Sequence, residues 1–319
     1  MSISAPKSQR GLALITVLLV FALVAVISSD VALRNFRDIR KTSNSINSKQ
    51  AYYYALAGEE YARQLLYRDF SEEGAASDTL SDNWANIGDL FDIENGAMSI
   101  EIIDLHNRFN LNNLLDRNDR INGAALKQFQ DLLSDLGIDE KIAYSALDWI
   151  DGNKQALAGG AEDDIYAQRD YLAANSPFVD RSELRLIEHV SVSDYQTLKD
   201  YVVALPLVVN NKKIGLTKYN INTLDAKLVE AFSNNSKTQV DAISSKQQRG
   251  GHNTLAEWTA SGLLNGLAAV NAQLDVKSDF FEIIVRAEFD QRTSVVRTHL
   301  YRNANDGNIT VVKRQQGFE

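Results

Sequence analysis

An uninterrupted apolar run stands almost at the start of the chain. Residues 11–29 carry no charge; they follow a polar segment with Lys7 and Arg10, and Asp30 comes directly after them. These 19 residues come close to the roughly 20 that a helix needs to cross the hydrocarbon core of a bilayer. Cations before the run favour a cytoplasmic N-terminus. The pattern therefore predicts one membrane span, with the bulk of the chain on the other side of the membrane.

The helical pattern continues beyond this span. Residues 30–70 contain no proline, and apolar side chains recur there at helical spacing, ending in the four-residue steps Tyr53, Ala57, Tyr61 and Leu65. We expect one helix over 12–70, about 88 Å long at 1.5 Å per residue, with Gly58 as a plausible bend.

Alternation of apolar and polar residues predicts strands at both ends of the remaining chain. One strand fits 98–105, and three more fit 281–289, 293–302 and 309–314. Segment 71–95 is polar and glycine-containing, so we expect a loop there with a short helix around Trp84 to Phe91. The intervening 170 or so residues read mainly as helices. The order of elements predicts an α+β protein whose sheet is interrupted by a helical insertion.

Composition narrows the range of functions. The chain has no cysteine, which excludes disulfides, thiolate metal sites and a cysteine nucleophile. Its formal net charge is −9, and residues 111–200 hold 9 Lys+Arg against 17 Asp+Glu, so we expect no nucleic acid as a partner. The four histidines are dispersed, and no HExxH, GxSxG or GxxxxGK[ST] motif is present. We therefore expect no enzymatic activity.

One acidic segment is a candidate for metal binding. Residues 148–164 combine several carboxylates with glycines that allow a tight loop, and hard oxygen ligands on such a loop suit Ca²⁺. The candidate ligands are Asp151, Glu162 and Asp163 first, then Asp148 and Asp164. The spacing is not that of an EF-hand. Composition alone leaves two interpretations open, a calcium site or a solvated acidic loop with a helix cap.

The start of the chain resembles the leader of type IV prepilins and type II secretion pseudopilins, because Arg10 and Gly11 stand directly before the apolar run. The resemblance implies that a membrane prepilin peptidase cuts between Gly11 and Leu12 and N-methylates Leu12. An ordinary secretory signal fits less well, since its small-residue cleavage site would follow the run. An uncleaved signal anchor is the alternative.

The fifth residue after this cleavage position is Thr16. Pilins usually have glutamate there, which is thought to pair with the terminal ammonium of a neighbouring subunit. A carboxylate inside a bilayer is costly without a partner. The absence of an acid at Thr16 therefore fits a subunit at the fibre tip, which has no neighbour above it.

The most specific resemblance lies after the first expected strand. Residues 106–114 read HNRFNLNNL and are similar to the GRFNLNNL signature of the minor pseudopilin K family of type II secretion systems (general secretion pathway protein K), with Asn107 in place of glycine. Four further motifs follow in the family's order: DWIDG at 148–152, GAED at 160–163, NSPF at 175–178 and INT at 221–223. The resemblance covers nearly all of 12–319.

The resemblance implies a pilin-like α+β fold: a long N-terminal hydrophobic helix packs on an antiparallel sheet that a large all-helical insertion interrupts. The expected division is a leader at 1–11, the membrane part of the helix at 12–29, the first pilin-like part at 30–110, the insertion at 111–275 and the C-terminal strands at 276–319. Members of the family bind calcium in the insertion, which favours a structural Ca²⁺ at the acidic segment.

The function that the resemblance implies is that of a minor pseudopilin at the tip of the periplasmic pseudopilus, anchored in the bacterial inner membrane with its N-terminus in the cytoplasm. The expected partners are the minor pseudopilins I and J, the major pseudopilin, the prepilin peptidase, the inner-membrane assembly platform and membrane lipid. With I and J the subunit would initiate assembly and limit fibre growth. The alternatives are a minor pilin of a type IV pilus and a signal-anchored periplasmic hydrolase.

Overall fold

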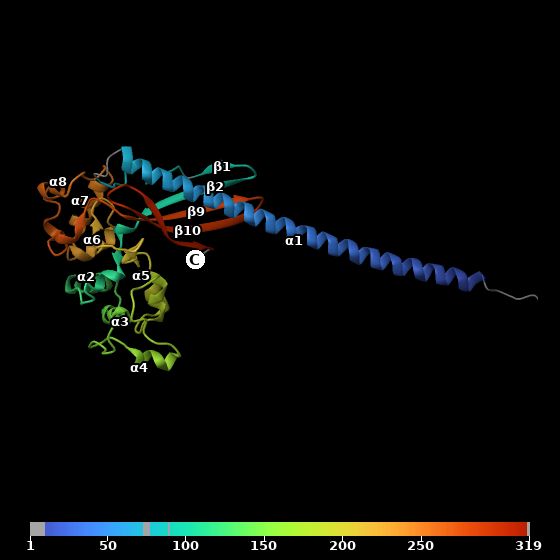
Figure 1. Ribbon diagram of the computed structural model, residues 1–319, viewed down its shortest axis with the longest axis horizontal. Coiled ribbons are helices and arrows are strands. Elements are labelled where there is room, and N and C mark those ends of the chain that lie inside the picture. Colours follow the sequence, from blue (N-terminus) through green and yellow to red (C-terminus); the bar gives the residue numbers. More distant parts are fainter. Residues whose placement is uncertain (1–9, 73–76, 89, 318–319) are drawn as a thin grey trace, which may run out of the picture.

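One helix dominates the molecule (Figure 1). The computed structural model describes residues 10–72, 77–88 and 90–317, so residues 1–9 of the expected leader lie outside the described residues. Helix α1 (Arg10–Glu72) has 63 residues, and its length is about 94 Å at 1.5 Å per residue. The predicted helix over 12–70 is confirmed. The helix α1 continues through Gly58, the residue at which a bend was expected, without interruption.

A five-stranded antiparallel sheet packs against the membrane-distal half of α1. Its order is β1-β2-β9-β10-β11, and the strands are β1 (Phe91–Ile93), β2 (Gly96–Asp104), β9 (Phe280–Phe289), β10 (Arg292–Arg302) and β11 (Ile309–Gln316). The four predicted strands are confirmed with shifts of a few residues. Strand β2 pairs with β9 across the whole insertion, for example Ile102 with Ile283. The α+β class is confirmed.

The short helix expected around Trp84 to Phe91 is wrong. The described residues before β1 form turns, because the Asp82 carboxylate accepts hydrogen bonds from the Thr79 amide, 2.7 Å, and from Trp84 Nε1, 3.1 Å. Such side-chain bonds offer the backbone an alternative to a helix. Trp84 is buried and meets the ring of Phe281 edge-on, with centroids 5.3 Å apart.

Small residues let α1 approach the sheet closely. Ala51, Ala55, Ala62 and Leu66 of α1 are buried, and the last three pack with Ile100, Ile102, Ile283, Val285 and Val296 of the sheet. A Cβ placed on Gly58 would lie 2.7 Å from Val285 Cγ1 and 2.8 Å from Met98 Sδ. A larger residue at Gly58 would therefore force α1 away from the sheet.

An ion pair between a buried carboxylate and a partly exposed guanidinium fixes the rotation of α1 on this surface. Glu59 is 3% exposed and accepts two hydrogen bonds from Arg314 of β11, at 2.7 and 2.6 Å, and a third from Thr298 of β10 at 2.7 Å. Burial opposes ionisation of Glu59, but the bonds from Arg314 and Thr298 lower its pKa below the usual value. The carboxylate thus joins α1 to two strands.

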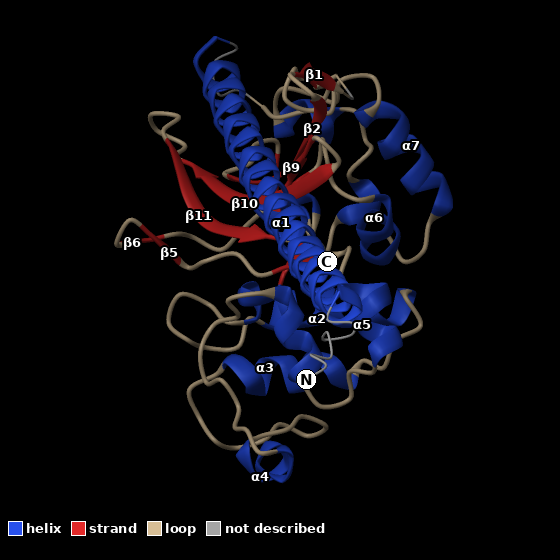
Figure 2. Ribbon diagram, turned by 90° about the vertical axis from the view of Figure 1, so that its right-hand side faces the viewer, coloured by secondary structure: helices blue, strands red, loops and turns tan. Residues whose placement is uncertain are grey.

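The chain between β2 and β9 forms the insertion, which Figures 1 and 2 show as helices gathered at the end of the sheet farther from the start of α1. Its α-helices are α2 (Gly123–Asp135), α3 (Lys141–Ile150), α4 (Asp163–Tyr166), α5 (Val192–Leu198), α6 (Ala226–Phe232), α7 (Lys237–Gln247) and α8 (Leu255–Ala260). Short 3₁₀ helices join them: η1 (Leu105–Asn107), η2 (Leu111–Leu114), η3 (Ala167–Arg169), η4 (Arg181–Leu186), η5 (Asn265–Leu267) and η6 (Asn271–Gln273).

The insertion is mostly helical, but it is not all-helical as expected. Three two-stranded pairs of two residues each lie within it: β3 (Phe109–Asn110) with β4 (Val202–Val203), β5 (Val208–Val209) with β6 (Lys212–Lys213), and β7 (Tyr219–Asn220) with β8 (Leu274–Asp275). The parallel pairs β3–β4 and β7–β8 join residues about 60 to 90 positions apart in the chain, which no local pattern of apolar residues could reveal.

A buried polar network joins the insertion to the sheet. Asp104, the last residue of β2, accepts hydrogen bonds from Ser278 Oγ at 2.6 Å, Thr223 Oγ1 at 2.5 Å and Asn220 Nδ2 at 3.1 Å. Ser278 stands two residues before the start of β9, so Asp104 links the points where the insertion leaves and re-enters the sheet. Arg302 of β10 extends the network through its bond to Ser278 O at 2.9 Å.

The Glu59–Arg314 pair predicts non-additive effects on stability. Because Arg314→Met leaves a carboxylate buried without its main partner, we expect it to lower the free energy of unfolding by about 2–4 kcal/mol. Glu59→Gln combined with Arg314→Met should recover at least half of that loss, because no charge remains buried. The free energies of unfolding of both variants can be measured by urea unfolding of the detergent-solubilised chain, monitored by far-UV circular dichroism. Additive losses in the double variant would contradict a pairwise interaction.

Candidate functional site

The exposed part of α1 is the first candidate functional surface. α1 is long and apolar enough to cross a membrane, and Gly11 lies within it. Leu12 is 72% exposed, and Thr16 turns its hydroxyl back to the Ala13 carbonyl at 2.9 Å, so the hydroxyl of Thr16 is satisfied within its own helix. The exposed apolar and aromatic side chains beyond the span are Val31, Leu33, Phe36, Ile39, Ile46, Tyr53, Tyr61 and Tyr67. A lone soluble subunit rarely leaves such a stripe uncovered.

The asparagines of the RFNLNN segment clamp three separate loops of the insertion. Asn112 donates to the carbonyls of Phe178 and Leu205, at 2.9 and 2.8 Å, and accepts from the Phe178 amide at 2.8 Å. Asn113 exchanges two hydrogen bonds with the Thr217 backbone, at 2.7 and 3.1 Å. Buried amide side chains with full sets of partners specify one arrangement of loops. The motif is therefore part of the scaffold.

The acidic segment brings three carboxylates into one buried region. Asp148 at the end of α3 is 0% exposed, Asp151 just after it is 6% exposed and Glu162 just before α4 is 2% exposed. The Leu157 amide donates to both Asp148 oxygens, at 3.2 and 3.1 Å, whereas neither oxygen of Glu162 has a hydrogen-bond partner among the described residues. A buried carboxylate without donors is costly.

The three buried carboxylates of this region have raised pKa values. Burial, followed by the negative charges of Asp148 and Asp151, raises the pKa of Glu162 to about 7. Burial also raises the pKa of Asp148 to about 6 and raises that of Asp151. Carboxylates that share a site compete for protons or for a cation. Asp148, Asp151 and Glu162 are named the acidic triad below.

The other two expected ligands are placed differently. Asp163 pairs with the Lys154 ammonium at 2.9 Å and accepts from the Ala173 amide at 3.1 Å, and the bond from Lys154 lowers the pKa of Asp163. Asp164 is exposed in the first turn of α4. Asn175 was not among the predicted ligands, yet its amide end lies 2.8 Å from the Asp151 carbonyl and 2.9 Å from that of Asn153, so it adds an oxygen or a donor to the same region.

A second group of carboxylates has the closeness that a metal site needs but already contains a cation. Oxygens of Asp69, Asp78 and Asp82 all lie within 4.8 Å of one another. The Arg302 guanidinium binds Asp78 and lies 3.3 Å from Asp69, and its carbon lies 4.8 Å from the centre of the Phe281 ring. Because the Arg302 guanidinium already occupies this group and offsets part of its charge, the group serves to hold the polar network at the end of α1.

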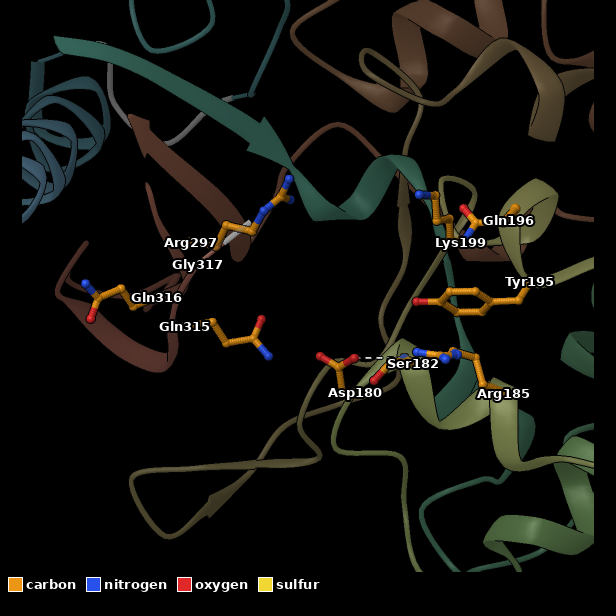
Figure 3. Close-up of a pocket in the computed structure, with 10 residues that line it drawn as sticks. All are labelled: Asp180, Ser182, Arg185, Tyr195, Gln196, Lys199, Arg297, Gln315, Gln316 and Gly317. Atoms are coloured by element: carbon orange, nitrogen blue, oxygen red, sulfur yellow. Dashed lines mark hydrogen bonds between the residues drawn. The ribbon is translucent and has the colours of Figure 1, made fainter. Parts of the chain in front are cut away.

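A pocket of about 480 Å³ lies between the insertion and the sheet (Figure 3). η4 and α5 form one wall, and β10 with the end of β11 forms the other. The lining residues are Asp180, Ser182, Arg185, Tyr195, Gln196, Lys199, Arg297, Gln315, Gln316 and Gly317, and together they are named the basic pocket. These residues come from two distant parts of the chain, so no local sequence pattern could predict this pocket.

Comparisons with known proteins agree with the architecture. A family model for the type II secretion system (T2SS), protein K, matches residues 107–207. The chain is similar to the type II secretion system protein K of Pseudomonas aeruginosa, with 32% identity over 323 residues that cover 98% of this chain and 94% of that protein. It is also 32% identical to the protein K of Klebsiella pneumoniae over 306 residues, covering 89% and 91%.

A solved structure gives the same result. A chain of the GspK–GspI–GspJ complex from the enterotoxigenic Escherichia coli type 2 secretion system superposes with a TM-score of 0.73 and 26% identity. The match covers 88% of this chain and 100% of that chain. Identity above 30% over nearly the whole length, joined to the same long helix, sheet and insertion, shows that the chain belongs to the type II secretion system protein K family.

Proposed function

We propose that this minor pseudopilin occupies the tip of the periplasmic pseudopilus as a structural subunit without catalytic activity. The observation that carries the proposal is the division of the molecule: an exposed apolar spine extends on one side, and the insertion lies at the opposite end of the head (Figure 1). A spine of this kind packs with the spines of neighbouring subunits. A broad membrane-distal head suits the top of a fibre better than its shaft.

The partners follow from the same surfaces. The solved relative is part of a complex named for GspK, GspI and GspJ, which supports a ternary complex of this chain with the corresponding minor pseudopilins I and J. Before assembly, the span would lie in inner-membrane lipid with its N-terminus in the cytoplasm, within reach of the prepilin peptidase and the assembly platform. The major pseudopilin would then add below the complex.

Processing before assembly is the first test. Cleavage between Gly11 and Leu12 would expose an N-methylated Leu12 at the start of the spine. Intact-mass and N-terminal peptide mass spectrometry on the membrane-extracted chain should find this terminus in cells with the prepilin peptidase and an intact Met1-derived terminus in cells without it. Gly11→Leu should block the cut, whereas Ser8→Ala should not. A cut after the apolar run would remove the fibre mechanism.

The insertion is expected to limit fibre growth by obstructing the addition of a subunit above it. Residues 107–276 can be replaced by a short Gly/Ser linker, since the two ends of the insertion meet at the joint, where Ser278 Oγ donates to Asp104 Oδ2 at 2.6 Å. Electron microscopy of cells that overproduce the major pseudopilin should then show longer pseudopili than in cells with the full chain. A normally processed but shortened subunit that leaves pseudopilus length unchanged would contradict the steric role.

We further propose that the acidic triad holds a structural Ca²⁺. The donor set fits this ion: three carboxylates, nearby backbone carbonyls and the Asn175 amide supply only oxygen. The unpartnered oxygens of Glu162 support the assignment. With its amide turned so that the nitrogen faces them, Asn175 donates to the Asp151 and Asn153 carbonyls; in a calcium-bound site its oxygen would face them across the cation. When bound, the ion would neutralise the triad and join α3 to α4.

Calcium should bind the full chain in neutral detergent and raise its melting temperature at pH 8. Isothermal titration calorimetry should show that Glu162→Gln weakens Ca²⁺ binding at least tenfold, while Asp164→Asn, which changes an exposed carboxylate on the same segment, stays within twofold of the parent. Affinity should fall as pH drops from 8 to 6, because the pKa values of Glu162 and Asp148 are about 7 and about 6 and a protonated carboxyl binds poorly.

The raised pKa values of the acidic triad also predict how the stability of the metal-free chain changes with pH. Raised pKa values mean that the folded triad holds more protons than the unfolded chain between about pH 4 and 7, so its contribution to stability in EGTA is largest at low pH and is lost as pH rises through this window. Glu162→Gln should flatten that loss, and Ca²⁺ should reverse it at pH 8. An equal response to Ca²⁺ in the parent and in Glu162→Gln would contradict the site.

A further inference from the structure

The basic pocket stands out against the charge of the whole molecule. The chain carries −9, yet the described residues that line the pocket and the small recess beside it include five arginines and lysines against two carboxylates, a local formal charge of +3. The cations are Arg108, Arg181, Arg185, Lys199 and Arg297, and the carboxylates are Asp180 and Glu282. Clustered charge of this sign creates a field that attracts anions.

Both carboxylates are already neutralised. Asp180 binds Lys313 and the Ser182 amide, and these bonds overcome burial and lower the pKa of Asp180 to about 2. Glu282 lies 3.3 Å from Arg297 and 3.7 Å from Arg108. Burial opposes its ionisation, but His299, Arg108 and Arg181 lower the pKa of Glu282 to about 2. Neither acid is therefore available to balance Arg185 or Lys199.

Two cations on the insertion wall remain uncompensated. In the described part of the chain, no carboxylate lies within ion-pair distance of Arg185 or Lys199. The Arg185 guanidinium lies over the Tyr195 ring, 5.8 Å from its centre, and Figure 3 shows the Arg185 head and the Tyr195 hydroxyl pointing into the pocket. Arg181 donates to the Lys199 carbonyl at 2.8 Å, which ties η4 to the end of α5. The wall is thus held in place before any ligand arrives.

Neutral donors and a strand edge complete the pocket. Ser182, Tyr195, Gln196 and Gln315 add hydroxyl and amide groups among the lining residues, and such groups suit a carboxylate together with its neighbouring peptide bonds. Strand β11 lies at the edge of the sheet, paired with β10, and its end lines the pocket. Sheet edges commonly pair with an extended segment of another chain.

We propose that the basic pocket binds an extended, carboxylate-rich segment of a partner polypeptide, with Arg185 and Lys199 as the specificity-determining cations. The volume of about 480 Å³ falls in the range of sites that enclose a few side chains. The proposal depends on the geometry of the insertion wall and the sheet. It does not require the calcium assignment or the position at the fibre tip.

A membrane lipid headgroup is a poorer occupant because the pocket lies too far from the span. Gln316 pairs with Val296, and Val296 pairs with Val285, which contacts the position of Gly58 in α1. Gly58 is 29 residues beyond Ser29, or about 44 Å at 1.5 Å per residue. Phosphate remains as a rival anion, and the test separates it from a peptide.

The test uses the full chain in neutral detergent at 50 mM NaCl and a fluorescein-labelled, end-capped peptide of sequence (Thr-Glu)₄. Fluorescence anisotropy should show that this peptide binds at least tenfold more tightly than (Thr-Lys)₄. Arg185→Glu with Lys199→Glu should weaken binding at least tenfold. Lys237→Glu with Arg249→Glu, which makes the same charge change at exposed positions of the insertion, should stay within twofold of the parent. Binding should also weaken at 300 mM NaCl.

Three outcomes would overturn the proposal: no binding of (Thr-Glu)₄, an equal loss in the two double variants, or displacement of the peptide by an equal concentration of inorganic phosphate. If the charge-reversed pocket variant melts well below the parent, Arg185→Gln with Lys199→Gln replaces it, with an expected loss of at least fivefold. Because the probe is a synthetic peptide, a negative result leaves the pseudopilin assignment intact, and an unprocessed N-terminus leaves the pocket result intact.

Discussion

The arrangement of the two halves of this molecule depends on one buried carboxylate, Asp104. It stands where the chain leaves the sheet, and its hydrogen bonds to Ser278, Thr223 and Asn220 return the chain to the sheet at the same point. An ionised carboxylate without donors would be costly here, but four donors, including the His106 amide at 2.8 Å, satisfy it. The insertion can therefore be large without disturbing the pairing of β2 with β9.

The contacts of Asp104 also determine which elements of the insertion face the sheet. Because the insertion is fixed at the membrane-distal end of the sheet, its η4 and α5 face the end of β11 and form the basic pocket. The acidic triad lies elsewhere in the insertion, between α3 and α4, where Gly160 allows close approach: a Cβ there would lie 1.9 Å from Asp148 Oδ2. The acidic triad and the basic pocket thus lie in separate parts of the molecule, and each attracts ions of the opposite charge.

The long helix α1 is oriented by its packing on the sheet. Its membrane part and the stripe beyond it are exposed, whereas the face from Ala51 to Leu66 is buried against the sheet. Small residues at the contact and the Glu59–Arg314 pair set one rotation of α1, and that rotation decides which apolar side chains remain for neighbouring subunits. Packing of the head thereby determines the face that the spine offers in a fibre.

The sequence by itself determined the elements with a strong local period: the long helix, the strands at both ends, the helical character of the insertion and the family. It also placed five candidate metal ligands on one short segment, and that assignment stays a prediction. Tertiary structure decided that Asp148, Asp151 and Glu162 are buried there and that Asp163 pairs with Lys154. The β3–β4 and β7–β8 pairs, the position of Asn175 beside Asp151 and Asn153, and the basic pocket were decided by tertiary structure alone. Each joins residues that are separated in the chain, and no local period records which segments will meet.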